Sequence, residues 1–579
     1  MNSLRHLLPY LKPYRTAIIF GSVSALISSG IGALGPWLLK LAIDSIQAGN
    51  ASHELLKYAL LIVGVALVAG FFRFLMRWIL IGMSREVELD LRNRVFKHLQ
   101  SLSASFYNKH RTGDLMARMT NDLESVRSIL GPGIMYPIDT FGLAVFSIIM
   151  MIIVSPKLTL YVLLMTPVVS VSVFYLGRLT HKLYTRIQEQ YSALSDAAQE
   201  NISGARIVRA FAQEEREIRK FDMLNREYVI RNVAMVKMQA LFMPLMFLFF
   251  EIGAAIILYL GGRGIIQGVM SLGDFVAFVG YLGMLAWPMI AIGWVANLIQ
   301  RGAASMKRIN EIMKVPPEIA QPERSRMPQE IRGEIVFKSV SFGYEKSEIL
   351  REINLHIKPG QTVAIVGRTG SGKTTLVNLL TRLFDPTFGT VLIDGIPTTE
   401  WDLEKLRAEI GMVPQDAFLF STTVERNIAF GRGNARREEV EKVSGIAQID
   451  KDVADFVNGY ETRVGERGLT LSGGQKGRVT LARALIRDPK ILILDDALAA
   501  VDTHTEEEIL NRLRDFMKGR TSIVISHRVS TVKHADRIYV LEGGKIVEQG
   551  KHDELLKQGG YYAELERRQR LEEELEREA

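Results

Sequence analysis

The chain has 579 residues, of which 48% are hydrophobic and none is cysteine. That length is too great for one hydrophobic core, and we therefore expect more than one domain. So apolar a composition is unusual for a wholly soluble protein, which indicates that one of the domains lies in a membrane. The lack of cysteine excludes disulfides and thiolate metal sites. The formal net charge of +8 indicates a class of partner only through where the basic residues lie along the chain.

Six apolar runs in the first half of the chain are long enough to cross a membrane. A span needs about 20 apolar residues to cross a hydrocarbon core of about 30 Å. The runs are roughly 17–39, 58–80, 134–154, 158–177, 241–262 and 275–298. A core helix of a soluble protein is the alternative for any one run, but six of them predict an α-helical membrane domain. No small-residue cleavage motif ends the first run, which indicates a retained span and not a signal peptide.

Lysine and arginine concentrate in two of the connections between these runs. The segments 81–133 and 178–240 are rich in both residues, as are the first 15 residues, whereas the other connections contain almost none. Positive charge stays on the cytoplasmic side of a membrane, so both long loops and both termini are predicted to be cytoplasmic. Because the basic residues follow the cytoplasmic loops, we expect no nucleic-acid partner.

Two acidic residues fall within the predicted spans. Glu251 lies inside the fifth run and Asp139 near the start of the third. A charged group at membrane depth is costly and usually faces a cavity or a partner. For Glu251 a substrate cavity and a structural ion pair both stay open, whereas Asp139 is expected near the outer interface.

The second half of the chain has the pattern of an α/β domain. Residues 302–330 are polar and interrupted by four prolines, which is typical of a linker, and strand-like and helix-like runs alternate from Ile335 onward. We therefore predict a transmembrane domain over 1–310, a linker over 311–330, a nucleotide-binding domain over 331–560 and a charged C-terminal helix over 561–579. That last helix is expected to be solvated, with a weak contact to a partner helix as the alternative.

A phosphate-binding loop opens the nucleotide domain. The sequence Gly-Arg-Thr-Gly-Ser-Gly-Lys-Thr over 367–374 fits the P-loop pattern at every fixed position, between an apolar run at 362–366 and a helix-like run at 376–380. Its backbone amides and the following helix N-terminus suit phosphate oxygens. Lys373 is predicted to reach the terminal phosphates and Thr374 to ligate Mg²⁺. The expected phosphate-binding residues are Gly367, Arg368, Thr369, Gly370, Ser371, Gly372, Lys373, Thr374 and Thr375.

Two further motifs follow the P-loop. Residues 491–495 read as a buried strand that ends in Asp495, which places that carboxylate to bind Mg²⁺, often through water. Before it lies Leu471-Ser472-Gly473-Gly474-Gln475. This pentapeptide, in this position, resembles the signature of ATP-binding cassette (ABC) transporters.

The resemblance extends to other elements in the family's order. It implies that Tyr344 stacks on adenine, that Gln415 senses Mg²⁺ and the attacking water, and that His527 is the switch histidine. Residues 462–468 resemble the exporter X-loop and residues 499–502 the D-loop. In this family two cassettes meet head to tail, so the resemblance implies that Ser472, Gly473, Gly474 and Gln475 bind the nucleotide held by the partner's P-loop.

Six spans ahead of one cassette, with long cytoplasmic loops, resemble an ABC exporter half-transporter. The resemblance covers nearly the whole chain and implies ATP and Mg²⁺ as ligands. It also implies a second half-transporter as partner, contact with membrane lipid and a small hydrophobic cargo. The expected location is a plasma membrane, the inner membrane of a bacterium.

The chain departs from the family at Asp496, where active members carry a glutamate that acts as general base or holds the lytic water. Such a base must lie about 3 Å from its proton. Aspartate is one methylene shorter, and a displacement of about 1 Å can cost about 100-fold in rate. Beside an intact signature, this predicts a heterodimer in which the Lys373 site is impaired and the partner supplies the glutamate. A homodimer with slow hydrolysis at two equal sites is the alternative.

The sequence therefore predicts ATP-driven export of hydrophobic or amphipathic molecules, such as drugs, peptides or lipids. Asp496, His527 and Gln415 are the expected catalytic residues, and Thr374, Gln415 and Asp495 the expected metal-binding residues. An ATP-gated channel or regulator shares these motifs and is the competing function. The identity of the cargo does not follow from the chain.

Overall fold

The computed structural model describes residues 7–49, 52–344, 347–465, 468, 470–499, 501 and 503–578. The chain forms two compact units. The helical unit comprises Met1–Leu99 and Gly113–Lys314, and the α/β unit comprises Gln100–Thr112 and Val315–Ala579. The short segment 100–112 therefore packs with the α/β unit, although it lies far from that unit in the sequence.

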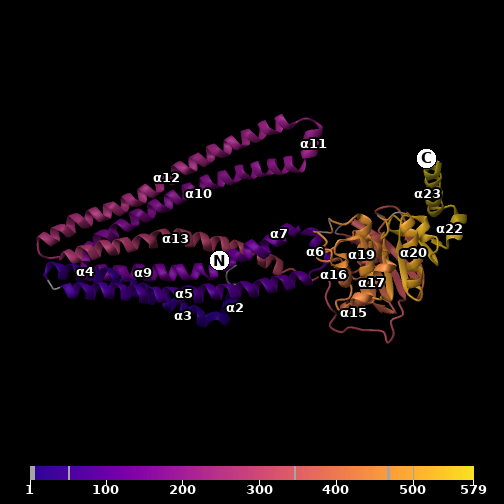
Figure 1. The fold of residues 1–579 in the computed structure, drawn as a ribbon, viewed down its shortest axis with the longest axis horizontal. Coiled ribbons are helices and arrows are strands. Elements are labelled where there is room, and N and C mark those ends of the chain that lie inside the picture. Colours follow the sequence, from indigo (N-terminus) through magenta and orange to yellow (C-terminus); the bar gives the residue numbers. More distant parts are fainter. Residues whose placement is uncertain are drawn as a thin grey trace. The chain divides into compact units, whose positions relative to one another are not determined.

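The helical unit consists of long helices with short connections (Figure 1). In chain order they are α2 (Leu8–Leu11), the 3₁₀ turn η1 (Lys12–Tyr14), α3 (Arg15–Gly32), α4 (Leu34–Gln47), α5 (Ser52–Ser101), α7 (Thr112–Ala117), the π-helical segment η2 (Arg118–Asp122), α8 (Leu123–Leu130), α9 (Pro132–Val154), α10 (Pro156–Ser203), α11 (Ala205–Ala210), α12 (Glu214–Ile266) and α13 (Leu272–Met313).

Local sequence signals fix where several of these helices begin. Pro156 occupies the first turn of α10, and the Ser155 hydroxyl caps that helix by accepting a hydrogen bond from the Leu158 amide at 3.4 Å. At the start of α13, Ser271 and Asp274 form a reciprocal capping box. Such caps satisfy amides that have no partner inside the helix, which places the breaks between consecutive helices at these residues.

Among the described residues, four helical stretches are long and apolar enough to cross a membrane. They are Pro9–Gln47, His53–Ser101, Thr112–Val154 and Leu272–Met313. These stretches contain four of the six predicted spans. The other two runs, 158–177 and 241–262, lie inside α10 and α12, which are helical but not among the four. The structure thus supports an integral membrane protein, and the number six is not confirmed.

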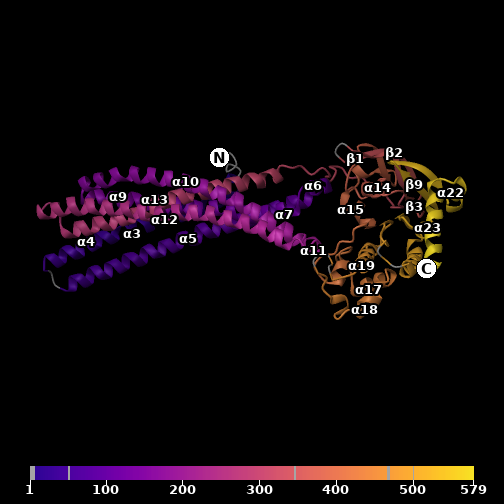
Figure 2. The same ribbon diagram turned by 90° about the horizontal axis from the view of Figure 1, so that it is seen from above.

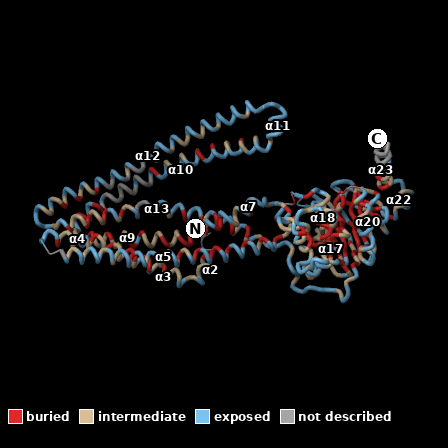
Figure 3. The backbone as a smooth tube through the Cα atoms, viewed as in Figure 1, coloured by how far each residue is buried: buried red, intermediate tan, exposed pale blue. Residues whose placement is uncertain are grey.

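Helices α10 and α12 form an antiparallel hairpin that is closed by α11 (Figures 1 and 2). The Gln190 side chain donates to the Leu224 carbonyl at 2.9 Å, and Arg231 donates to the Arg186 carbonyl at 2.9 Å. Around α11 the hairpin is largely exposed in this single chain (Figure 3), including the apolar side chains of Ile207 and Phe211.

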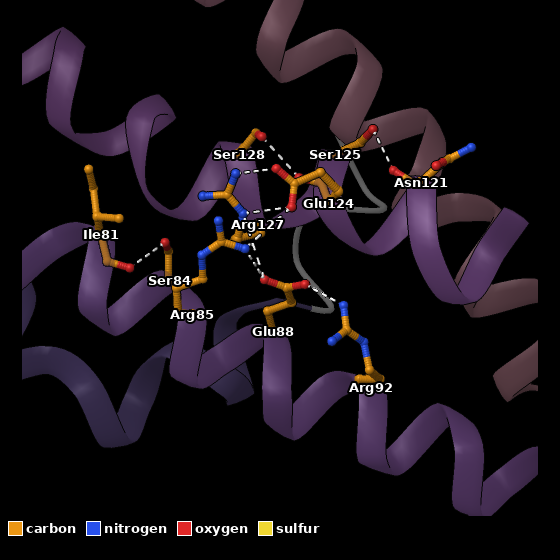
Figure 4. A network of polar contacts seen from close by, with 10 residues as sticks. All are labelled: Ile81, Ser84, Arg85, Glu88, Arg92, Asn121, Glu124, Ser125, Arg127 and Ser128. Atoms are coloured by element: carbon orange, nitrogen blue, oxygen red, sulfur yellow. Dashed lines mark hydrogen bonds and ion pairs between the residues drawn. The ribbon is translucent and has the colours of Figure 1, made fainter.

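A polar network joins α5 to α8 (Figure 4). Glu88 on α5 is buried and accepts hydrogen bonds from Arg85 at 3.0 Å and Arg92 at 2.5 Å. Arg127 on α8 lies 3.7 Å from the Glu88 carboxylate and also pairs with Glu124. Because Glu88 contacts three guanidinium groups from two helices, its carboxylate holds the cluster together.

Replacing Glu88 by glutamine is expected to destabilise the protein by about 2 kcal/mol, because three guanidinium groups would lose their shared buried carboxylate. Partial exposure of Arg85 and Arg92 keeps the expected loss below that of a fully buried pair. Thermal unfolding in detergent measures the change. Glu86→Gln, at a neighbouring exposed position of α5, is the matched control, and an equal melting shift for both variants would contradict the role given to Glu88.

The α/β unit contains two sheets. The six-stranded sheet has the order β10-β9-β3-β8-β7-β6, in which β9, β3, β8, β7 and β6 pair in parallel, and the four-stranded sheet has the order β2-β1-β4-β5 with antiparallel pairs. The strands are β1 (Ile335–Tyr344), β2 (Ser347–Ile357), β3 (Thr362–Val366), β4 (Phe388–Ile393), β5 (Ile396–Pro397), β6 (Ile410–Val413), β7 (Ile491–Asp495), β8 (Thr521–Ile525), β9 (Arg537–Glu542) and β10 (Lys545–Gly550).

Helices cover these sheets and form a separate helical part around α17, α18 and α19 (Figure 2). The unit's helices are α6 (Ala104–Lys109), α14 (Lys373–Leu380), η3 (Thr398–Glu400), α15 (Leu403–Ala408), α16 (Val424–Ala429), α17 (Arg437–Ile446), α18 (Asp450–Asp455), η4 (Gly459–Glu461), α19 (Gly473–Leu485), α20 (Thr503–Met517), α21 (Val529–Val532), α22 (His552–Gln558) and α23 (Tyr561–Glu578). One core lies between the two sheets and includes the fully buried Trp401, and a second packs α19 and α20 against β7.

Helix α6 is the part of segment 100–112 that packs on the α/β unit. Ala104 contacts the core between the two sheets, and the Ser103 and Ser105 hydroxyls both donate to the Glu318 carboxylate. This contact links the loop that leaves α5 to the α/β unit of the same chain.

Helix α23 was expected to be solvated, and this expectation is wrong for its first half. The side chains of Tyr562 and Leu565 are buried in a cluster that includes Val366 of β3 and Val529 of α21. The sparse leucine pattern of the tail did not indicate this contact, because the most buried side chain of the helix is that of Tyr562.

Candidate functional site

The predicted nucleotide-binding residues converge because of the strand order. In a parallel sheet the carboxyl ends of all strands meet at one edge, where open α/β sheets bind ligands. The neighbouring strands β3, β8, β7 and β6 are followed in turn by the P-loop, His527, Asp496 and Gln415. Four motifs that are far apart in the sequence therefore lie side by side.

The P-loop needs glycine at particular positions. Gly367 has φ 154°, and a Cβ atom there would lie 2.1 Å from the Leu541 carbonyl oxygen. Gly372, immediately before α14, has φ 103°, which side-chain-bearing residues rarely adopt. This conformation turns the backbone so that α14 begins at Lys373 with its N-terminus at the loop, the arrangement that favours anions.

Lys373 is buried at the base of the loop. Its ammonium group donates to the carbonyl oxygens of Gly367 at 2.9 Å and Arg368 at 3.0 Å. Burial lowers the pKa of Lys373, and the nearby carboxylates of Asp496 and Asp495 oppose that shift. A buried ammonium group next to an open cavity contacts few water molecules. A phosphate group that enters the cavity would therefore bind to it strongly.

A cavity of about 240 Å³ brings many of the predicted site residues together, although Gly367, Arg368 and Ser371 of the P-loop do not line it. Its lining combines residues from the P-loop with residues in or shortly after β1, β2, β6, β7 and β8. They are Tyr344, Ile349, Thr369, Gly370, Gly372, Lys373, Thr374, Thr375, Gln415, Asp495, Asp496, Ile525 and His527. Tyr344 stands at its edge, where its ring packs edge-on against Phe342 and Phe384 with centroids 5.0 and 5.3 Å apart.

Two buried polar atoms, one in the P-loop and one at the end of β7, have no hydrogen-bond partner among the described residues. They are the Ser371 hydroxyl oxygen and one carboxylate oxygen of Asp495. Burial raises the pKa of Asp495, while a hydrogen bond from Thr374 acts in the opposite direction. A buried, unpaired carboxylate oxygen beside a threonine hydroxyl fits a hard divalent cation, and the donor set therefore suits Mg²⁺.

Asp496 and His527 face each other across the cavity. The His527 Nε2 atom lies 4.0 Å from a carboxylate oxygen of Asp496, which is beyond hydrogen-bond distance. Asp496 has φ 49°, in the left-handed region, and its amide donates to the Ile525 carbonyl at 2.9 Å. Aspartate tolerates this region better than most residues do, so the backbone here favours a short acidic side chain.

The signature residues do not line this cavity. Ser472 caps α19 and forms a capping box with Gln475, whose side-chain amide also donates to Asp452 at 2.9 Å. Ser472 and Gly473 are exposed, and Gly474 and Gln475 are half-buried. The N-terminus of α19 is thus a separate surface of the α/β unit, open to a second molecule.

Parts of two predicted loops lie outside the described residues. These are residues 466, 467 and 469 in and beside the predicted X-loop, and residues 500 and 502 of the predicted D-loop. The described part of the first loop pairs with the segment before α16, since the Val464 amide donates to the Thr422 carbonyl at 2.8 Å.

The two acidic residues of the predicted spans have different surroundings. Asp139 on α9 accepts a hydrogen bond from the Ser29 hydroxyl of α3 at 2.9 Å, so it joins two helices. Glu251 is exposed on α12 and forms no ion pair with another described residue. The ion-pair interpretation of Glu251 therefore gains no support within this chain.

Arg483 is a residue that motif reasoning missed. It lies on α19 and donates to the Phe418 carbonyl at 2.8 Å and to the carbonyl and side-chain oxygens of Asn427 at 2.8 and 2.9 Å. Burial lowers the pKa of Arg483 to about 10, which leaves it charged at neutral pH. The arginine ties the signature helix to the segment that follows Gln415, and no local pattern marks it.

Replacing Arg483 by methionine is expected to destabilise the α/β unit by about 3 kcal/mol, because three oxygens lose a charged donor while the apolar stem is kept. Urea unfolding measures the loss, followed by the fluorescence of Trp401 in a background in which the four tryptophans of the helical unit are replaced by phenylalanine. Lys490→Met, at an exposed position, is the control. Equal stability of the two variants would show that these hydrogen bonds make no net contribution to the free energy of unfolding.

Comparison with known proteins gives consistent matches along both units. Residues 18–289 match the family described as ABC transporter transmembrane region, and residues 350–499 match the family described as ABC transporter. The chain is 39% identical over 572 residues to the probable multidrug resistance ABC transporter ATP-binding/permease protein YheI of Bacillus subtilis, with 97% of each chain covered.

Two further matches span nearly the full length. The ATP-dependent lipid A-core flippase of Syntrophus aciditrophicus is 35% identical over 566 residues, with 98% of this chain and 94% of the flippase covered. The solved structure of a bacterial Atm1-family ABC exporter with ATP bound matches with a TM-score of 0.76 and 30% identity, over 97% of this chain and 99% of that one.

Proposed function

Because this chain belongs to the ABC transporter family, as an exporter-type half-transporter whose membrane region is fused to its ATPase domain, we propose that it exports hydrophobic or amphipathic molecules. We further propose that it acts in a heterodimer and contributes the hydrolysis-impaired ATP site. Asp496 carries this proposal, since it lines the cavity with Lys373 and His527 where active family members place a longer carboxylate.

The residues around the cavity have distinct proposed roles. Lys373 and the P-loop amides hold the phosphates, Tyr344 stacks on adenine, and Thr374, Asp495 and Gln415 hold Mg²⁺. When bound, Mg²⁺ would offset the negative charge of the terminal phosphates. Asp496, His527 and Gln415 surround the terminal phosphate and the lytic water. Ser472 to Gln475, exposed at the start of α19, would complete the site on the partner's P-loop.

The reach of Asp496 supports an asymmetric pair of sites. Its carboxylate ends one methylene earlier than that of glutamate, and its left-handed backbone suits aspartate better than glutamate. Binding of ATP needs no such base and is kept, whereas hydrolysis at the Lys373 site is slow. ATP favours the state in which the two cassettes are closed on each other only through the extra contacts that it makes in that state. A site that hydrolyses ATP slowly stays occupied for longer and would therefore hold the two cassettes together.

The proposed arrangement in the membrane follows the predicted topology. We propose six spans in a bacterial inner membrane, with both termini cytoplasmic, and the division into 1–310, 311–330, 331–560 and 561–579. Four stretches of suitable length and apolarity support this topology. Relatives named for multidrug resistance and for a lipid A-core flippase support an apolar or amphipathic cargo.

Transport into inside-out membrane vesicles tests the proposal. Vesicles that contain this chain and its partner half-transporter should accumulate an amphipathic fluorescent dye when ATP is added, and vesicles with Lys373→Ala in this chain should not. Uptake against the dye gradient supports a pump. Uptake that runs only down the gradient would instead support an ATP-gated channel.

The same preparation tests the heterodimer. Affinity purification of the chain should recover a second, similar polypeptide in equal amount. Recovery of the chain alone as an active dimer would overturn the proposed asymmetric pair, while leaving the export function in place.

A further inference from the structure

The C-terminal helix α23 contacts two loops of the nucleotide site. At its first turn, the ring of Tyr561 lies beneath the guanidinium of the P-loop residue Arg368, 5.7 Å from the ring centroid. Farther along, Gln569 reaches the loop that carries His527. A helix that lies outside both sheets thus contacts residues that follow β3 and β8.

The docking of α23 is built from several independent contacts. Tyr562 is fully buried, with its hydroxyl 2.8 Å from the His552 Nδ1 atom, and Leu565 is buried beside Val366 and Val529. The Glu548 carboxylate accepts hydrogen bonds from the first backbone amides of the helix. These contacts place the middle of α23 at a fixed position beside the loop after β8.

Gln569 bridges the backbone on both sides of Arg528. Its side-chain nitrogen donates to the His527 carbonyl at 2.5 Å, and its side-chain oxygen accepts from the Val529 amide at 2.8 Å. Both groups are near the start of α21, where the first helical amides have no partner inside the helix. One amide side chain therefore satisfies a donor and an acceptor of the same loop.

The opposite side of the loop is held by Glu506 of α20. This buried carboxylate pairs with Arg528 and accepts from the Thr531 hydroxyl at 2.7 Å. His527 itself is not fixed in this way, because its ring is 42% exposed and lies 4.0 Å from Asp496. The position of the imidazole consequently depends on the backbone that Gln569 and Glu506 hold.

We propose that Gln569 is a positioning residue for the ATP site, through which the docked helix α23 keeps the His527 imidazole directed at Asp496 and the terminal phosphate. The inference rests on the proposed function, because it takes His527 as the residue that contacts the terminal phosphate. Displacement of α23 would free the His527 carbonyl and let the imidazole move away from the cavity. A displacement of about 1 Å at such a group can cost about 100-fold in rate.

The test compares Gln569→Met with Arg567→Ala in the full-length transporter. Methionine keeps the length and bulk of the side chain but has no amide, and Arg567 is exposed on the same helix. All variants also carry Asp496→Glu, so that hydrolysis at the Lys373 site is measurable. The readouts are steady-state kcat and KM for ATP, with the glutamate of the partner's site replaced by glutamine, together with hydrogen exchange of the peptide that spans 526–532.

Gln569→Met is expected to lower kcat about tenfold with KM changed less than twofold, and to speed exchange of the Val529 amide about tenfold. Combined with His527→Ala, it should add no further loss of kcat, because both changes act through the same imidazole. Arg567→Ala should change neither readout.

An unchanged kcat in Gln569→Met, with His527→Ala impaired, would overturn this inference and leave the proposed function intact. The inference would also be overturned if the losses of kcat in Gln569→Met and His527→Ala added fully in the double variant, because the Gln569 amide would then not act through His527. If His527→Ala itself leaves kcat unchanged, the proposed role of His527, and with it the proposed site, is overturned instead.

Discussion

Replacing Lys373 by alanine is expected to weaken ATP binding to the purified full-length protein about 100-fold, or about 2.7 kcal/mol. Lys373 is buried beneath the P-loop, and its ammonium group points at the carbonyls of Gly367 and Arg368 beside the cavity. Without this cation, the phosphates would have to enter a site that contains Asp495 and Asp496. Titration with a fluorescent ATP analogue measures the affinity.

Lys358→Ala is the matched control for this change, because Lys358 is exposed on the same domain and does not line the cavity. It should bind ATP as the unaltered protein does. ATP affinity of Lys373→Ala within threefold of the control would show that the cavity is not the nucleotide site. Circular dichroism of both variants guards against a loss that reflects misfolding.

Replacing Asp496 by glutamate is expected to raise hydrolysis at the Lys373 site about 20-fold. The longer side chain restores about 1 Å of reach, worth about 100-fold in rate. The left-handed backbone at φ 49° offsets part of that gain, since glutamate is less tolerated there, at a cost of about 1 kcal/mol. Single-turnover hydrolysis of radiolabelled ATP by the assembled transporter, with the glutamate of the partner's site replaced by glutamine, measures the change.

Asp496→Asn is the companion variant for this prediction. It removes the charge at constant size and should change turnover of the assembled transporter little, because we propose that hydrolysis occurs mainly at the partner's site. A large loss in Asp496→Asn would contradict the asymmetric pair. A lack of gain in Asp496→Glu, with Asp496→Asn neutral, would mean that another element of the Lys373 site is also impaired.

The assembly of the cavity could be predicted from the sequence because parallel strands impose it. Once the runs before the P-loop, Gln415, Asp496 and His527 are interpreted as strands of one sheet, their carboxyl ends must share an edge. The structure places all four in one cavity, and their catalytic roles stay predictions. The division into a helical unit and an α/β unit followed equally from the apolar runs.

The contacts made by single side chains over long sequence distances could not be predicted. Gln569 lies 42 residues after His527 and sits in a tail whose composition is mostly charged. Its contacts depend on the docking of Tyr562, which the interpretation of the tail as a solvated helix did not predict. Arg483 and Glu88 are similar, because neither belongs to a motif and their partners come from other elements.

The topology of the helical unit was predicted only in part. Apolar length and basic loops suggested six spans, but α10 and α12 continue far beyond their apolar runs as amphipathic helices. Helix length alone therefore does not show where a membrane segment ends, and four stretches of suitable apolarity are found among the described residues.

The ATPase rate of this chain, purified to homogeneity and free of any similar subunit, tests the impaired site most directly. We expect the chain to bind ATP through Lys373 and to hydrolyse it slowly, with the rate rising when the glutamate-bearing partner is added. Rapid hydrolysis at two equal sites by the chain alone, unchanged by the partner, would contradict the account.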